Sequence, residues 1–233
     1  HVNINRLLEL TKPVATAVVP ISAGRHIYKR EPSFPIAVAC DPAFNFVYEA
    51  NIRYLHHLGE VTYFSPLADT SLPDAGFVYL PGGYPELYLA ALSANRQMLQ
   101  SIRRYVESGG KLLAECGGMM YLCDEIRDKN GDVYPMAGVL HQSATMENMK
   151  LRLGYRTLLY NETRLKGHEF HYSRLVEQQN PLPSCAVAYT AKGVETDTPL
   201  YHYKNVWAGY THLYWADPVG NEWFTKFVID GNT

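Results

Sequence analysis

Residues 111–121, Lys-Leu-Leu-Ala-Glu-Cys-Gly-Gly-Met-Met-Tyr, constrain the fold more than any other part of the chain. The first five have the apolar character of a short buried strand. Residues 117–122 have the character of the first turns of a helix. Cys116 therefore lies at the corner between a strand and a helix. A sharp corner of this kind exposes its central side chain above the sheet and needs small neighbours, which Ala114 and Gly118 provide.

The corner would favour chemistry at Cys116 in two ways. The first N–H groups of a helix have no partner inside it, so the Gly117 N–H is expected to be one donor to an oxyanion. The positive end of the helix is also expected to stabilise the thiolate, which is the nucleophilic form. A free cysteine is, however, among the most frequently buried residue types. The stretch by itself leaves a small core residue and a nucleophile equally open.

Strand-like and helix-like segments alternate around this corner. Strands are predicted at residues 36–40, 61–64 and 77–80, and helices at 47–58 and 98–106. This alternation is typical of a doubly wound, mostly parallel sheet with helices on both faces. Ligands of such sheets bind beyond the carboxyl ends of the strands. The loop that begins Pro81-Gly82-Gly83 is therefore expected on the same rim as Cys116.

The pattern of apolar and polar residues changes after residue 135. Residues 151–155 and 166–172 alternate in polarity, a further strand is expected at 185–189, and a closing helix near 221–229. This half is predicted to add antiparallel strands. Residues 34–233 are interpreted as one domain without an internal boundary. Residues 1–33 are interpreted as a linker or the tail of a preceding domain, with an N-terminal arm packed on the domain as the alternative.

The composition excludes several classes of function. Apolar residues make up 47% of the chain, enough for a substantial core, and a net charge of −2 argues against nucleic acid as a partner. No apolar run approaches the length of a membrane-spanning helix. The four cysteines lack zinc-site spacing, which favours reduced thiols in the cytoplasm. The chain begins at His1 and has no phosphate-binding Gly-x-x-x-x-Gly-Lys motif, so we expect a piece of a longer protein without its own ATP site.

A catalytic thiol needs a base, and the nine histidines supply the candidates. His212 is expected at the end of an apolar strand that spans residues 206–214. A cysteine and a histidine that are distant in sequence are the usual pair, because they meet in space. His168 and His171 compete for the role, since they flank a strand-like segment on opposite faces.

Four motifs follow one another in an order and at a spacing that resemble a known family, the glutaminase domain of cobyrinic acid a,c-diamide synthase. The resemblance covers residues 34–230. The motifs are Pro81-Gly82-Gly83-Tyr84-Pro85-Glu86, Ala114-Glu115-Cys116-Gly117-Gly118-Met119, Gly167-His168-Glu169-Phe170-His171-Tyr172-Ser173, and the segment around His212.

The resemblance implies the class I, or triad-type, glutamine amidotransferase fold and its mechanism. Cys116 would attack the side-chain amide of glutamine, and His212 would move the proton. The N–H groups of Gly83 and Gly117 would hold the oxyanion. Related amidotransferases often place a carboxylate two residues after the histidine, but here Tyr214 stands there. Either the pair works as a dyad or another group orients the histidine.

Glu86 and Glu169 are the two candidates for that orienting carboxylate. The segment that carries His168, Glu169 and His171 either lines the glutamine pocket or faces the synthetase domain; a solvated antiparallel strand is the alternative.

The resemblance further implies a parent chain with an N-terminal ATP-dependent synthetase domain. That domain would hold ATP and Mg²⁺ and contact the corrin, while this chain would carry no cofactor. Ammonia made here would amidate the a and c carboxylates of cobyrinic acid. The rivals are the glutaminase domain of cobyric acid synthase or of another tetrapyrrole a,c-diamide synthase, and a non-catalytic docking domain of the same fold. A cysteine hydrolase of esters or peptides is a further rival.

Overall fold

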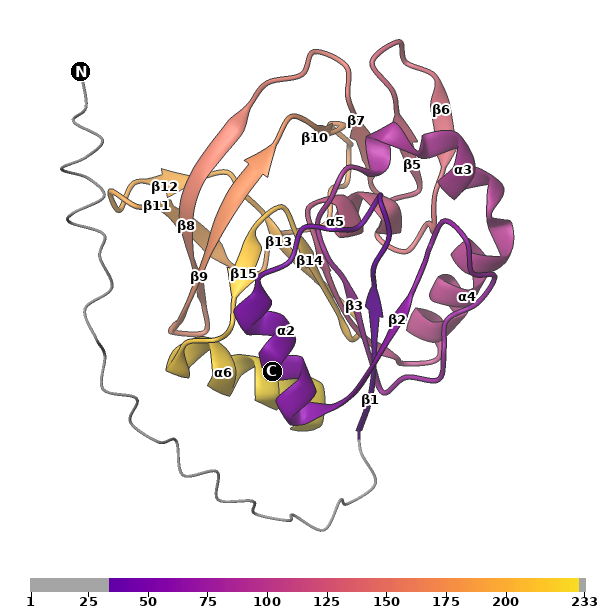
Figure 1. The fold of residues 1–233 in the computed structure, drawn as a ribbon. Coiled ribbons are helices and arrows are strands. Elements are labelled where there is room, and N and C mark those ends of the chain that lie inside the picture. Colours follow the sequence, from indigo (N-terminus) through magenta and orange to yellow (C-terminus); the bar gives the residue numbers. More distant parts are fainter. Residues whose placement is uncertain (1–33, 231–233) are drawn as a thin grey trace, which may run out of the picture. The chain divides into compact units, whose positions relative to one another are not determined.

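The computed structural model describes residues 34–230, and its central element is a six-stranded sheet with the order β13-β14-β4-β3-β1-β2 (Figure 1). All neighbouring strands in it are parallel except the edge strand β13, which runs antiparallel to β14. This confirms the predicted mostly parallel sheet. The strands are β1 (Phe34–Ala39), β2 (Gly59–Phe64), β3 (Phe77–Leu80), β4 (Lys111–Glu115), β13 (Leu200–Tyr203) and β14 (Val206–Gly209).

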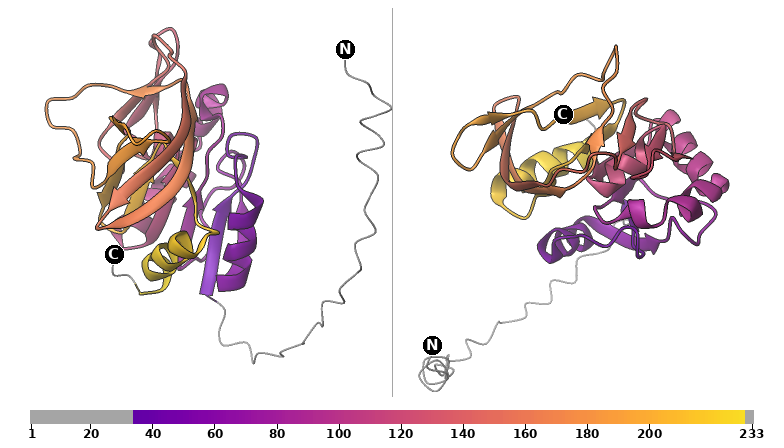
Figure 2. Two further views of the ribbon diagram at one scale, coloured as in Figure 1. Left: turned by 90° about the vertical axis from the view of Figure 1, so that its left-hand side faces the viewer. Right: turned by 90° about the horizontal axis from the view of Figure 1, so that it is seen from above.

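Helices cover both faces of this sheet, which is why its inner strands are continuously apolar. One face packs against α3 (Leu89–Ala94), α4 (Arg96–Glu107) and α5 (Gly117–Leu122). The other packs against α2 (Glu49–Leu58), α6 (Pro218–Thr225) and the π-helical turn η2 (Lys226–Asp230). The views in Figure 2 show α2 and α6 beside the sheet. The 3₁₀ turn η1 (Pro85–Leu87) follows the loop after β3.

The chain after α5 adds two further sheets. The five-stranded one confirms the predicted antiparallel strands, whereas the four-stranded one, which begins at residue 125 and includes a parallel pair, was not predicted. One has four strands in the order β10-β7-β5-β6, namely β10 (Arg174–Leu175), β7 (Ser143–Thr145), β5 (Glu125–Arg127) and β6 (Val133–Pro135). The other has five antiparallel strands in the order β12-β11-β8-β9-β15, namely β12 (Glu195–Thr196), β11 (Val187–Thr190), β8 (Arg152–Tyr160), β9 (Thr163–His171) and β15 (His212–Tyr214).

The expectation of one strand across residues 206–214 is wrong. The chain leaves the six-stranded sheet after Gly209, passes through Tyr210 and Thr211, and joins the five-stranded sheet as β15. Apolar residues continue through the break because both strands are buried, so the sequence pattern hides the change of sheet. His212 is therefore held by a different sheet from the one that carries Cys116.

The closing helix begins earlier than residue 221. Asp217 accepts a hydrogen bond from the Gly220 N–H at 2.7 Å, and Pro218 occupies the first helical position, so the two residues define the start. Across the described part of the chain no helix has the length and apolarity needed to cross a bilayer. The interpretation of residues 1–33 as a linker lies outside the described residues, and the domain limits 34–233 stay a prediction.

Gly118 tests how tightly the corner after β4 is packed. A Cβ atom at this position would lie 2.1 Å from the carbonyl oxygen of Leu80, which is backbone and cannot move aside. We expect Gly118→Ala to lower the free energy of unfolding by about 1–3 kcal/mol, the usual cost of overpacking. Urea denaturation measures it. Gln97→Ala, at an exposed position of α4, is the control and should change the free energy of unfolding by less than about 0.5 kcal/mol; equal losses would contradict this account of the corner.

Candidate active site

Cys116 lies at the corner that the sequence predicted, between the end of β4 and the start of α5. Its backbone has φ 48° and ψ −106°, a conformation that non-glycine residues rarely adopt. A backbone hydrogen bond helps to hold Cys116 in this conformation, because its N–H donates to the Gly209 carbonyl at 2.7 Å. Residues kept in such strained conformations concentrate at functional sites. The strained backbone therefore favours a functional role for Cys116 over a purely structural one in the core.

Cys116 borders two small cavities of about 20 and 10 Å³. Each has room for roughly one water molecule. The first is lined by Gly83, Tyr84, Glu86, Cys116, Met120, Phe170, His171, Tyr172 and Ser173. The second is lined by Phe46, Gly83, Tyr84, Cys116, Phe170 and His212. The structure thus brings Cys116, Gly83 and His212 to one cavity, from three segments that are far apart in the sequence.

His212 is buried and held among rings. Its imidazole stacks on His168 with a centroid distance of 4.9 Å and meets Phe46 edge-on at 4.5 Å. A Cβ at Gly82 would lie 2.1 Å from its Cε1, so the glycine is what makes room for the ring. The Nδ1 atom has no hydrogen-bond partner among the described residues. Burial, and then the positive charges of His168 and His171, lower the pKa of His212 to about 3.

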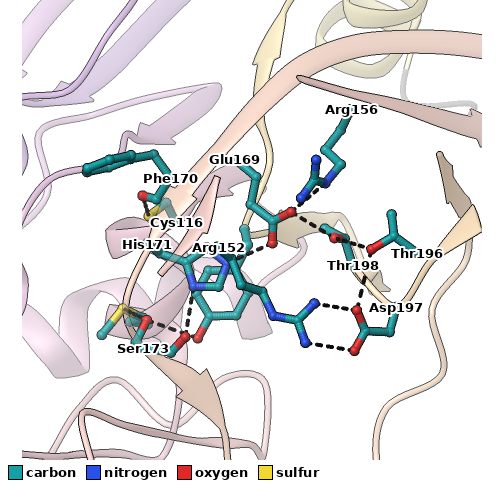
Figure 3. Close-up of polar contacts among 12 residues, drawn as sticks. Cys116, Arg152, Arg156, Glu169, Phe170, His171, Ser173, Thr196, Asp197 and Thr198 are labelled. Carbon is teal, nitrogen blue, oxygen red and sulfur yellow. Dashed lines mark hydrogen bonds and ion pairs between the residues drawn. The ribbon is translucent and has the colours of Figure 1, made fainter. Parts of the chain in front are cut away.

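The thiol of Cys116 keeps its proton in this closed site. Burial raises the pKa of Cys116 to about 12, and the negative charge of Glu86 adds to the effect. The Gly117 N–H offsets it only in part. The expectation that the helix end keeps the sulfur ionised is wrong here, because α5 is a short helix and the cost of desolvation exceeds its influence. Both the thiol and the imidazole are therefore neutral. The Cys116 Sγ donates to the Phe170 carbonyl at 3.8 Å (Figure 3), and no hydrogen bond joins it to His212 among the described residues.

The two proposed oxyanion donors, Gly83 and Gly117, lie against each other. A Cβ at Gly117 would be 3.2 Å from the Gly83 nitrogen and 2.7 Å from the Pro85 Cδ. Adjacent parallel strands β3 and β4 bring them together, since both glycines follow the carboxyl ends of these strands. The geometry is compatible with two converging N–H donors, and their role stays a prediction.

Glu169 does not orient His212. Its carboxylate accepts hydrogen bonds from His171 at 2.7 Å, from Arg156 at 2.6 Å and from Thr198 at 2.9 Å (Figure 3). Burial, the largest influence, raises the pKa of Glu169, but the bonds from His171 and Thr198 and the charge of Arg156 bring it below its usual value. The carboxylate is thus committed to these partners and stays ionised.

His171 lies on the inner face of β9, and its other nitrogen, Nδ1, faces the Ser173 carbonyl at 2.8 Å. Its ring stacks on Tyr210 at 3.7 Å. The ring borders the Cys116 cavity and also a larger one of about 310 Å³ that does not reach the sulfur. His168 points to the other face, where the Tyr48 hydroxyl meets its Nδ1 at 2.5 Å. The predicted opposite placement of His168 and His171 is confirmed.

Glu86 borders the cavity of Cys116 rather than the ring of His212. Burial raises its pKa. Among residues 34–230, no carboxylate is hydrogen bonded to His212, and the cysteine–histidine dyad stays a prediction. No group of three metal-ligating side chains occurs in this part of the chain either.

Sequence reasoning missed three contributors to the site. Phe46 and Phe170 line the cavity that Cys116 and His212 share. Phe170 lies in the predicted 167–173 motif but was not singled out, and nothing in the local sequence of Phe46 indicates its place. Glu115 is a buried carboxylate immediately before the cysteine, at 2% exposure. A charged residue inside the apolar run of residues 111–115 was the signal that could have found it.

Solved structures with the same fold define the class of protein. PurLQS from Thermotoga maritima superposes with a TM-score of 0.53 at 16% identity, covering 85% of this chain and 96% of its own. A structure titled glutamine amidotransferase gives 0.52 at 17% identity, covering 83% and 98%. A further glutamine amidotransferase from Thermotoga maritima gives 0.51 at 12% identity, covering 85% and 84%. The fold is that of the glutamine amidotransferases.

Sequence comparison identifies the family within that class. Residues 35–219 match the model of the CobB/CobQ-like glutamine amidotransferase domain, and the chain belongs to this family. It is 40% identical over 185 residues to the hydrogenobyrinate a,c-diamide synthase of Pseudomonas aeruginosa, covering 77% of this chain and 41% of that protein. The cobyrinate a,c-diamide synthase of Fusobacterium nucleatum is likewise 40% identical over 188 residues, with the same coverage. The chain thus spans less than half the length of these relatives.

The raised pKa of Cys116 predicts slow alkylation. At about pH 7.5 the thiolate is a minor form, so iodoacetamide should label Cys116 at least about tenfold more slowly than the exposed Cys40 of the same chain. The rate at Cys116 should keep rising as the pH is raised beyond 9, since a raised pKa moves ionisation upward. Mass spectrometry of each peptide measures both sites. Equal rates at the two cysteines would contradict a protonated, enclosed thiol.

Proposed function

We propose that this glutamine amidotransferase domain hydrolyses glutamine with a Cys116–His212 dyad and supplies ammonia to an ATP-dependent amidation. The observation that carries the proposal is the shared cavity of Cys116, His212 and Gly83 at the rim of the parallel sheet. Membership of the family supports it.

The first half of the reaction follows from the protonation states. His212, with its pKa near 3, is an unprotonated base at neutral pH, and Cys116 is a thiol. His212 takes the thiol proton as the sulfur attacks the amide carbon, and the N–H groups of Gly83 and Gly117 stabilise the oxyanion. His212 then gives the proton to the leaving nitrogen, so ammonia departs and a thioester remains.

Water completes the cycle by hydrolysing the thioester. His212 removes a proton from the water during the attack and returns it to the sulfur, which releases glutamate and restores the thiol. The cavity beside Cys116 has room for a single water but not for glutamine. Tyr84 and Tyr172, both partly exposed, form part of its wall. Glutamine therefore requires this wall to move, and turnover by the domain alone should be slow.

We further propose that the ATP-dependent domain docks on the outward face of β8 and β9. Leu153 is 60% exposed and pairs with Phe170, which lines the Cys116 cavity. Tyr155 is 75% exposed and pairs with His168, which stacks on His212. Residues opposite each other in an antiparallel pair share a face, so an exposed apolar surface leads directly to the site.

The relatives suggest what the docked part does. The chain covers only 41% of their length, which leaves room for a separate domain in each. That domain would bind ATP and Mg²⁺, activate the a and c carboxylates of the corrin, and receive the ammonia. Cobyrinate or hydrogenobyrinate is the proposed substrate, from the names of the relatives. The alternative is that the parent is a cobyric acid synthase or another tetrapyrrole a,c-diamide synthase. We propose the cytoplasm as the compartment, where the four free cysteines stay reduced.

Glutamine hydrolysis with matched variants tests the dyad. The chain should release glutamate slowly, and Cys116→Ala should abolish the release. His212→Asn should lower it by about 10²–10⁴-fold, the usual worth of a general base. Cys123→Ala, a buried thiol away from the cavity, is the control and should keep the activity. In a full-length parent protein, Cys116→Ala should stop amidation from glutamine but spare amidation from added ammonia. Loss of both routes would contradict the division of labour; absence of hydrolysis even in that protein would favour a docking domain.

Paired polar substitutions test the docking face. Leu153→Asn with Tyr155→Asn should leave slow hydrolysis by the separate chain unchanged, because neither side chain lines the cavity. The stimulation by the ATP-dependent half should fall at least about tenfold, since the apolar contact is lost. Lys192→Gln, on the exposed turn after β11, is the control. Stimulation at the unmodified level would overturn this choice of surface.

A further inference from the structure

Glu115 is a buried carboxylate for which the mechanism above has no use. It is the last residue of β4 and is 2% exposed. Its Oε2 accepts a hydrogen bond from the Tyr79 hydroxyl at 2.7 Å, and its Oε1 accepts one from the Leu213 N–H at 3.0 Å. Burial raises its pKa to about 7, offset in part by these two donors and by the Trp215 indole. A buried carboxylate is costly, so its presence calls for a function.

The partners of Glu115 belong to the three segments that form the site. Cys116 follows Glu115 directly. Tyr79 lies in β3, which runs into the glycine loop of Gly83. Leu213 follows His212 directly. Glu115 is therefore next to the nucleophile in the sequence, and its carboxylate is hydrogen bonded to the strand before the oxyanion loop and to the residue after the base.

The bond to Leu213 also crosses between sheets. β4 belongs to the six-stranded sheet, whereas β15 is the edge strand of the five-stranded sheet and pairs on one side with β9. On the other side of β15, Glu115 accepts a hydrogen bond from the Leu213 N–H. There the Asn51 Nδ2 donates to the Leu213 carbonyl at 2.8 Å. Asn51 is fully buried and also accepts from the Trp215 N–H at 3.1 Å. The backbone of Leu213 is thus held at both its N–H and its C=O group.

We propose that Glu115 is a positioning residue that sets the separation of Cys116 and His212 by holding β15 to the end of β4. Glu115 points away from reacting atoms to Tyr79 and Leu213, so it acts through the backbone of its neighbours. The Nδ1 of His212 has no partner among the described residues, so the ring depends on its own peptide for its place. The inference rests on the proposed glutaminase function for its kinetic readout.

Two variants separate hydrogen bonding from packing. Glu115→Met keeps a side chain of similar size but removes both acceptors, which leaves the Leu213 N–H and the Tyr79 hydroxyl unpaired. We expect kcat for glutamine to fall about 100-fold, as for a small misplacement of reacting groups, with KM within about threefold. Glu115→Gln retains the geometry, since its oxygen accepts from Leu213 and its amide donates to the Tyr79 oxygen. Its kcat should stay within about threefold of the unmodified chain.

Tyr79→Phe is a milder variant, which keeps the proposal testable if Glu115→Met does not fold. It removes one donor and leaves the bond to Leu213, so kcat should lie between the values for Glu115→Gln and Glu115→Met. Unmodified kcat in Glu115→Met, with the protein folded by circular dichroism, would overturn the proposal. So would equal losses in Glu115→Met and Glu115→Gln, because the charge and not the geometry would then matter.

Hydrogen exchange gives a readout that needs no activity. The Leu213 amide should exchange at least about tenfold faster in Glu115→Met than in the unmodified chain, while the Leu113 amide in β4 changes little. If neither the chain nor the full-length parent protein hydrolyses glutamine, the proposed function fails, but the exchange result still decides whether Glu115 holds β15 to β4. If hydrolysis occurs and Leu213 exchange is unchanged in Glu115→Met, the positioning role alone is wrong.

Discussion

The sharp corner after β4 is the constraint on which the rest of the site depends. The backbone of Cys116 is held at a positive φ, and α5 begins in contact with the loop after β3. Gly117 and Gly118 are required there because a Cβ at either would strike Pro85 or the Leu80 carbonyl. The corner thus places a thiol, two candidate N–H donors and a helix start within one small volume at the rim of the sheet.

Desolvation governs the chemistry within that volume. The Cys116 pKa is raised and the His212 pKa is lowered, so both groups are neutral at rest. A neutral pair needs no counter-charge, which agrees with the absence of a carboxylate on His212 among the described residues. Proton transfer then accompanies attack on the substrate rather than preceding it. Enclosure also limits wasteful reaction of the thiol while no substrate is present.

The site is assembled from two sheets that the fold must hold together. Cys116 comes from the parallel sheet and His212 from the antiparallel one. Backbone pairing does not join them at this point, because among residues 34–230 β15 pairs only with β9. Buried polar side chains take the place of backbone pairing. Glu115 accepts from the Leu213 N–H, and Asn51 donates to the Leu213 carbonyl. The cost of burying a carboxylate is reasonable where it replaces missing backbone hydrogen bonds.

The sequence by itself determined the parallel sheet, the corner at Cys116 and the antiparallel strands at residues 151–155 and 166–172, because apolar periodicity and glycine spacing are local properties of the chain. It did not show that residues 206–214 divide between two sheets, since both parts are buried and equally apolar. Only the tertiary structure decided that Glu169 pairs with His171 and Arg156, that Glu115 holds Leu213, and that Cys116 keeps its proton. Each of these depends on which distant groups come into contact and on how much water they exclude, and no local pattern encodes either.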